Sequence, residues 1–126
     1  MKPGALDVLA RIEARGIPWA IATSSQFESA HRKIAVSDLA GRVSTLVTAG
    51  CVARCKPAPD PYLRAADLMG LAAADCLGFE DSDVGAASAK AAGLCVVQVP
   101  DVGAVTGQHA DFIAPDLGRG ADWAGL

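Results

Sequence analysis

Short, continuously apolar segments alternate with amphipathic ones along this chain, and that alternation limits its possible folds more than any other feature. Buried strands are predicted at five apolar runs, residues 18–22, 44–49, 76–79, 95–99 and 111–114. Helices are predicted between them, at residues 4–15, 25–36, 61–69 and 84–92. Apolar strands that alternate with helices are typical of a parallel sheet covered on both faces, so we expect an α/β fold.

Two of the predicted helices carry recognisable start signals. The segment Ser25-Gln-Phe-Glu28 fits a capping box, in which a hydroxyl and a carboxylate three residues later satisfy the first backbone amides. Asp60 is expected to cap the helix whose first residue is Pro61, a favoured position for proline.

Composition excludes several classes of protein. The chain has 126 residues, 52% hydrophobic and 20% charged, which suits one domain with its own core and excludes disorder. Its net charge of -3 indicates no basic face, so nucleic acid is not an expected partner. No apolar run is long enough to cross a membrane and no apolar signal region follows the first residues, so we expect a cytoplasmic protein without membrane contact.

The four cysteines do not indicate a metal site. Cys51 and Cys55 are close in sequence, but a closed zinc site needs four ligands, usually in two spaced pairs. Cys76 and Cys95 stand singly inside apolar runs, where we expect them to be buried. Reduced thiols in a cytosolic protein are therefore the expected state.

Polar residues follow three of the predicted strands. In order along the chain they are Thr23-Ser24-Ser25, then Lys56 in a proline-flanked loop, then Glu80-Asp81-Ser82. The carboxyl ends of parallel strands are where such sheets bind ligands. Hydroxyls, an ammonium group and two carboxylates suit a phosphate and a divalent cation. Each group also has an interpretation without catalysis: the hydroxyls as a helix cap, the lysine as a surface residue, and the carboxylates as the acidic first turn of a helix.

Three segments, Ile21–Ser25, Lys56–Tyr62 and Gly78–Gly85, resemble the haloacid dehalogenase superfamily, and most closely its phosphoglycolate phosphatase and β-phosphoglucomutase subgroup. The opening residues 2–10 resemble the segment with which that subgroup's chain re-enters its core from a cap domain. The resemblance extends from Pro3 to about Leu117. It implies a Rossmann-like three-layer fold and a magnesium-dependent phosphatase or phosphoryl transferase acting on a small phosphorylated metabolite.

The resemblance also implies roles for individual residues. Thr23 and Lys56 would be catalytic: the Thr23 hydroxyl, with the Ser24 amide, would hold the phosphoryl group, and Lys56 would neutralise its charge. Asp81 would bind Mg2+, with Glu80 as a second ligand or one acting through water. Ser82 would cap the following helix and support the metal site.

One motif of the family is missing from the sequence. The family begins its core with an apolar strand ending in Asp-x-Asp-Gly-Thr or Asp-x-Asp-Gly-Val, whose first Asp is the nucleophile. Asp81-Ser82-Asp83 is not that motif, because the other motifs do not follow it in order. Residues 1–126 are therefore predicted to be one partial core domain that lacks the nucleophile strand and the cap. Alone it should be inactive and bind Mg2+ weakly or not at all.

Several explanations of the missing motif stay open. Either the sequence is part of a longer protein, the explanation that we favour, or a partner chain supplies the nucleophile. A non-catalytic module that binds phosphate or a partner is the alternative function. A receiver domain fits less well, because its acidic pair precedes its Thr/Ser and Lys, and a plain α/β domain with helix caps alone is a further alternative.

The missing strand would lie between the strands ending at Ala22 and Phe79. Unpaired backbone groups on two such facing edges would each cost about 1–3 kcal/mol. We therefore expect the edges to pair with each other, to be filled by another segment, or to accept a strand from another chain.

Overall fold

The computed structural model describes residues 2–101 and 104–126 and has the alternating α/β order that the sequence predicts. The helices are α1 (Ala5–Ala14), α2 (Phe27–Ala35), α3 (Asp60–Met69), α4 (Asp83–Ala92) and α5 (Leu117–Trp123). The strands are β1 (Ile21–Ala22), β2 (Leu46–Val47), β3 (Leu77–Glu80), β4 (Cys95–Gln98) and β5 (Phe112–Ile113). Two short 3-10 helices, η1 (Ala49–Cys51) and η2 (Ala73–Asp75), precede α3 and β3.

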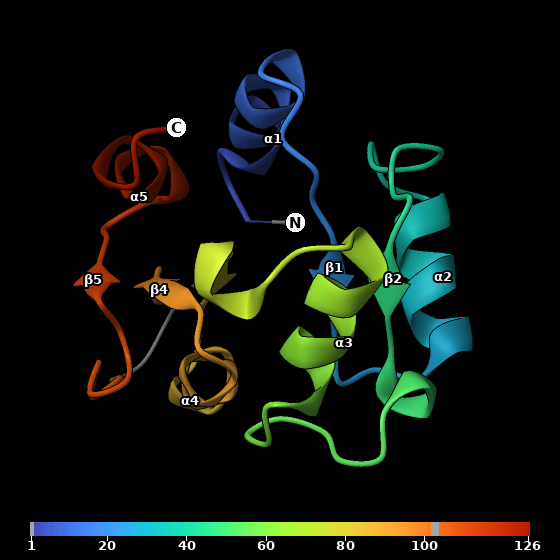
Figure 1. Cartoon of the computed structure of the whole chain (residues 1–126). Coiled ribbons are helices and arrows are strands. Elements are labelled where there is room, and N and C mark those ends of the chain that lie inside the picture. Colours follow the sequence, from blue (N-terminus) through green and yellow to red (C-terminus); the bar gives the residue numbers. More distant parts are fainter. Residues whose placement is uncertain (1, 102–103) are drawn as a thin grey trace.

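The strands form two parallel sheets instead of one. β1 pairs with β2, and the second sheet has the order β3-β4-β5. The strands stand in a row with α1 and α5 on one face and α3 and α4 on the other, while α2 flanks β2 (Figure 1). This is the three-layer arrangement expected from the sequence, with its sheet divided between β1 and β3.

Helices hold the two sheets together. α3 packs on β1 and β2, α4 packs on β3 and β4, and the two helices also contact each other. On the opposite face, α1 packs against α5. The strands ending at Ala22 and near Phe79 belong to different sheets, and those edges neither pair with each other nor are filled by another described segment. An open cavity of about 1070 Å³ lies there, lined by residues of both sheets and of α1 and α3.

Small side chains allow the helices to approach the sheet closely. Ala86 and Ala89 of α4 are fully buried against Val96 of β4. On the other face, a Cβ at Gly120 of α5 would come within 2.7 Å of a Val97 methyl group. Both contacts need a helix residue with little or no side chain, which explains the low aromatic content of the core.

Several local predictions need correction. The capping box at Ser25 is wrong: the residue before α2 is Gln26, and Ser25 lies in the preceding turn. Asp60 does not cap α3 but is its first residue. β1 and β2 are shorter than predicted, since β1 is hydrogen-bonded only to β2 among the described strands. Helix α5 was not predicted, although the Asp116 carboxylate caps it by accepting from the Arg119 amide.

None of the helices in the described part of the chain combines the length and the apolar character that a bilayer crossing requires.

Candidate phosphate site

Lys56 connects the carboxyl ends of the two sheets. Its Nζ donates to the carbonyl oxygen of Ala22 at 3.0 Å and to Oε1 of Glu80 at 2.5 Å. Ala22 is the last residue of β1, and Glu80 is the last residue of β3. The Lys56 and Glu80 side chains are only 12% and 9% exposed, so the ammonium is held at the end of the cavity between the sheets.

The loop after Lys56 is fixed to α4. The fully buried Ser88 of α4 donates its hydroxyl proton to the carbonyl oxygen of Ala58 at 2.6 Å. Just before Lys56, the exposed Arg54 forms an ion pair of 3.1 Å with Asp60, the first residue of α3. These contacts limit where the Lys56 backbone can lie.

The hydroxyl segment is anchored at the end of β1. The Thr23 amide donates to the Val47 carbonyl at 2.9 Å, and the Thr23 hydroxyl oxygen accepts from the Ser25 amide at 3.1 Å. A hydroxyl that accepts a hydrogen bond keeps its own proton for donation. Thr23 and Ser24 directly follow Ala22, whose carbonyl oxygen accepts a hydrogen bond from Lys56.

The acidic segment forms the turn from β3 into α4. Ser82 caps α4 by accepting from the Gly85 amide at 3.1 Å, as predicted. Asp81 is exposed beside it. The Glu80 carboxylate lies against Gly85 so closely that a Cβ there would overlap it. The structure thus brings Lys56 and Glu80 into contact and places Thr23, Ser24, Asp81 and Ser82 in the turns that follow β1 and β3.

Tyr62 is part of this cluster and was missed at the sequence level. Its hydroxyl donates to Oε1 of Glu80, and its ring centroid lies 5.3 Å from Nζ of Lys56. Burial, and then the negative charge of Glu80, raise the pKa of Tyr62 above its ordinary value. Its spacing in the sequence gave no sign of this contact, which joins α3 to the last residue of β3.

The acidic side chains of the described residues do not gather into a cluster of metal ligands. No group of three or more His, Cys, Asp or Glu side chains able to hold a metal occurs within residues 2–101 and 104–126. Mg2+ demands near-octahedral coordination by oxygens. Glu80 already accepts from Lys56 and Tyr62, which leaves Asp81 as the exposed carboxylate of the pair.

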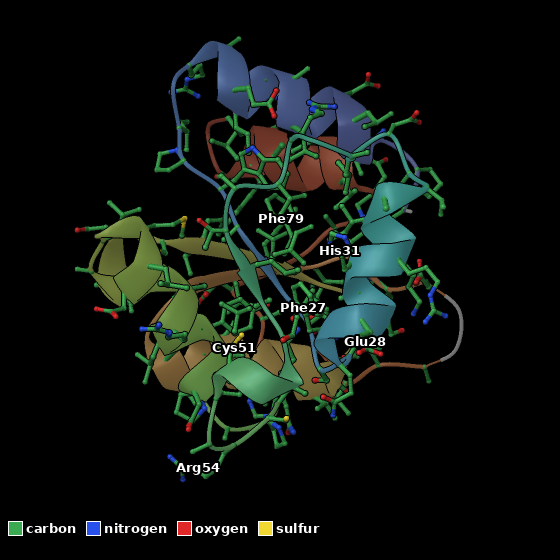
Figure 2. All side chains as sticks on the ribbon, turned by 90° about the vertical axis from the view of Figure 1, so that its right-hand side faces the viewer. Phe27, Glu28, His31, Cys51, Arg54 and Phe79 are labelled. Carbon is green, nitrogen blue, oxygen red and sulfur yellow. The ribbon has the colours of Figure 1, made fainter. Side chains whose placement is uncertain are left out.

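The cysteines lie outside this cluster of contacts. All four are free thiols, and Cys51 and Cys55 are exposed. The hydroxyl and then the amide of Thr48, both 3.4 Å from the sulfur, lower the pKa of Cys51. Figure 2 shows Cys51 at η1 and Arg54 farther along the same loop. Cys76 and Cys95 are half-buried instead of fully buried as expected, and burial raises the pKa of both.

Comparison with known proteins identifies relatives of this chain. The profile of one hydrolase family, haloacid dehalogenase-like hydrolase, matches residues 1–93. Protein CbbY of Rhodobacter capsulatus is 42% identical over 127 residues, covering 97% of this chain and 56% of that protein. Hexitol phosphatase A of Escherichia coli strain K12 is 41% identical over 97 residues, covering 77% of this chain and 44% of that protein.

A solved structure shares the fold of this chain. The crystal structure of a HAD family hydrolase from Deinococcus radiodurans R1, with bound phosphate and sodium, superimposes with a TM-score of 0.73 at 30% identity. The superposition covers 87% of this chain and 52% of that one. The chain therefore spans about half the length of the relatives that it matches.

Proposed function

The chain belongs to the haloacid dehalogenase-like hydrolases, and we propose that it supplies the phosphate-binding half of a phosphohydrolase core. The observation that carries this proposal is the position of Lys56. Its ammonium donates to the carbonyl oxygen of Ala22, the residue before Thr23 at the end of β1, and to the Glu80 carboxylate at the end of β3. A fixed positive charge at that edge suits a phosphoryl group, whose transfer depends on positioning and charge stabilisation.

Each polar residue has a proposed task there. Lys56 neutralises charge on the phosphoryl oxygens, and the Thr23 hydroxyl donates to one of them with the Ser24 amide beside it. Ser82 fixes the turn that presents Asp81, and Glu80 holds the lysine. Mg2+, when bound, would add charge neutralisation, with Asp81 and then Glu80 as the residues offered by this chain.

The nucleophile is proposed to come from an extended strand between β1 and β3. The cavity there has apolar walls, including Ile21 of β1 and Leu77 and Phe79 of β3. A strand running parallel to both would place its carboxyl end beside Lys56, where an aspartate could attack phosphorus. This polypeptide or a partner chain would provide that strand.

The relatives and the cysteines support proposals for the substrate class and the compartment. We propose a small phosphorylated metabolite as substrate. The name of one relative, hexitol phosphatase A, supports this class of substrate. Four free thiols support a reducing compartment, and we propose the cytoplasm.

The experiment that tests the binding role is a titration of the chain with inorganic phosphate, followed by amide NMR. Phosphate should shift the amide resonances of Thr23, Ser24 and Lys56. Lys56→Met should weaken binding by about tenfold or more, because a charged hydrogen bond contributes roughly 1.5–3 kcal/mol. Lys33→Met, which removes the same charge from the exposed side of α2, should not weaken it.

Shifts that are absent, or unchanged by Lys56→Met, would contradict the phosphate-binding role. Shifts confined to another surface would instead favour a module with a different partner.

A further inference from the structure

The Glu80 carboxylate serves two donors through one oxygen. Oε1 accepts from the Lys56 ammonium at 2.5 Å and also from the Tyr62 hydroxyl. Two donors at one oxygen compete for the same charge, so each bond is weaker than it would be alone. This arrangement makes the strength of the Lys56–Glu80 pair depend on Tyr62.

Tyr62 packs beside Gly78, and Glu80 packs beside Gly85. The half-buried Tyr62 ring lies 3.5 Å from the position that a Cβ on Gly78 would take, and its hydroxyl donates to Glu80. The Glu80 carboxylate fills the space beside Gly85. Lys56 has a long flexible stem, and its described bonds to Ala22 and Glu80 use two of its three ammonium protons.

We propose that Tyr62 is a positioning residue that shares the Glu80 carboxylate with Lys56 and so keeps the lysine available to a phosphoryl oxygen. This inference rests on the proposed function. When an anion arrives, Lys56 turns towards it while Glu80 keeps a hydrogen bond from Tyr62. The buried carboxylate is therefore never left without a donor, which would otherwise oppose the movement of the lysine.

The test measures how fast the Lys56 amine is acetylated by an N-hydroxysuccinimide ester, by peptide mass spectrometry. Lys2, Lys33 and Lys90 are the other lysines and serve as internal references. Tyr62→Phe keeps the ring and removes the hydroxyl, so Glu80 should hold Lys56 more tightly. Lys56 acetylation should slow by about threefold to fivefold, the effect of roughly one hydrogen bond, and phosphate should bind more weakly by a similar factor.

A merely structural role for Tyr62 predicts the opposite sign. Loosened packing would expose Lys56 and speed its acetylation, and that result, or an unchanged rate, would overturn the proposal. In a Glu80→Gln background, Tyr62→Phe should change the Lys56 rate little, because its effect passes through the carboxylate. An effect of Tyr62→Phe on the Lys56 rate that persists in the Glu80→Gln background would also overturn the proposal.

A second measurement avoids any loss of packing. Tyr62 is the single tyrosine of the chain, so growth on 3-fluorotyrosine alters this residue alone. The fluorinated phenol is a stronger donor and should speed Lys56 acetylation, whereas a slower or equal rate would contradict the proposal. None of these rates requires bound phosphate, so their failure is distinct from failure of the proposed function.

Discussion

At the scale of single residues, the candidate site depends on positions that carry no side chain. Gly85 lies in the first turn of α4, where its amide donates a hydrogen bond to the Ser82 hydroxyl. The Glu80 carboxylate occupies the space that a Cβ at Gly85 would need. A Cβ at Gly78 on β3 would lie in ordinary contact with the Tyr62 ring, at 3.5 Å. Gly85 therefore leaves the space in which Glu80 meets both Lys56 and Tyr62, in a nearly buried place.

Gly85→Ala should therefore lower stability although alanine is the better helix former. The new methyl group must displace the Glu80 carboxylate, and such overpacking costs about 1–3 kcal/mol. Urea unfolding measures the difference. Gly118→Ala in α5 is the matched control, since its Cβ would meet nothing closer than 3.4 Å, and it should cost nothing. Equal effects of the two substitutions would refute the role given to Gly85.

At the scale of elements, Asp83 connects the start of α4 to β4 and to the loop before β5. Its carboxylate accepts from the Thr106 amide at 2.9 Å, the Gln98 side chain at 3.1 Å and the Gly107 amide at 3.2 Å. Led by the Thr106 amide, these donors lower the pKa of Asp83 from 3.8 to about 2. Protonation of this carboxylate weakens all three contacts.

The sign of the pH dependence follows from that shift. A pKa depressed in the folded state gives stability that is present above the unfolded value and lost as the pH falls. The free energy of unfolding should thus decrease between about pH 4 and pH 2, and Asp83→Asn should flatten this part of the profile. Denaturant unfolding across the pH range tests it. Asp38→Asn, a substitution at an exposed position, is the control and should leave the pH dependence of the free energy of unfolding unchanged. A profile of the Asp83→Asn variant as steep as that of the wild type would argue against this role of Asp83.

Sequence patterns predicted the elements better than their contacts. Apolar runs located the five strands, and the order of hydroxyl, lysine and acidic segments predicted the residues of the candidate site. Helix α5 escaped prediction because Gly118 and Gly120 lower its helix propensity, while Gly120 is needed for close contact with Val97. Tyr62 escaped because its bond to Glu80 joins residues on different elements, a contact that only tertiary packing specifies.

At the scale of the whole molecule, the sheet is divided between β1 and β3, and the turn after β3 is where this chain would offer ligands to Mg2+. Glu80 and Asp81 provide two carboxylates, and the described residues form no group of three or more metal-binding side chains. Mg2+ keeps its waters unless several oxygens converge on it. Calorimetry should therefore detect no Mg2+ binding tighter than about millimolar. Micromolar binding that disappears with Asp81→Ala would contradict this expectation.

We propose that β1 and β3 accept a strand that brings an aspartate to Lys56. The direct measurement is p-nitrophenyl phosphate hydrolysis, with Mg2+, by the chain fused through a flexible linker to an apolar strand ending in Asp-x-Asp-Gly-Thr. The fusion should hydrolyse the ester, and Lys56→Met or replacement of the first added Asp by Asn should abolish the activity. The unfused chain should be inactive. Turnover by the unfused chain at about 1 per second or more, or an active fusion indifferent to Lys56→Met, would contradict the account.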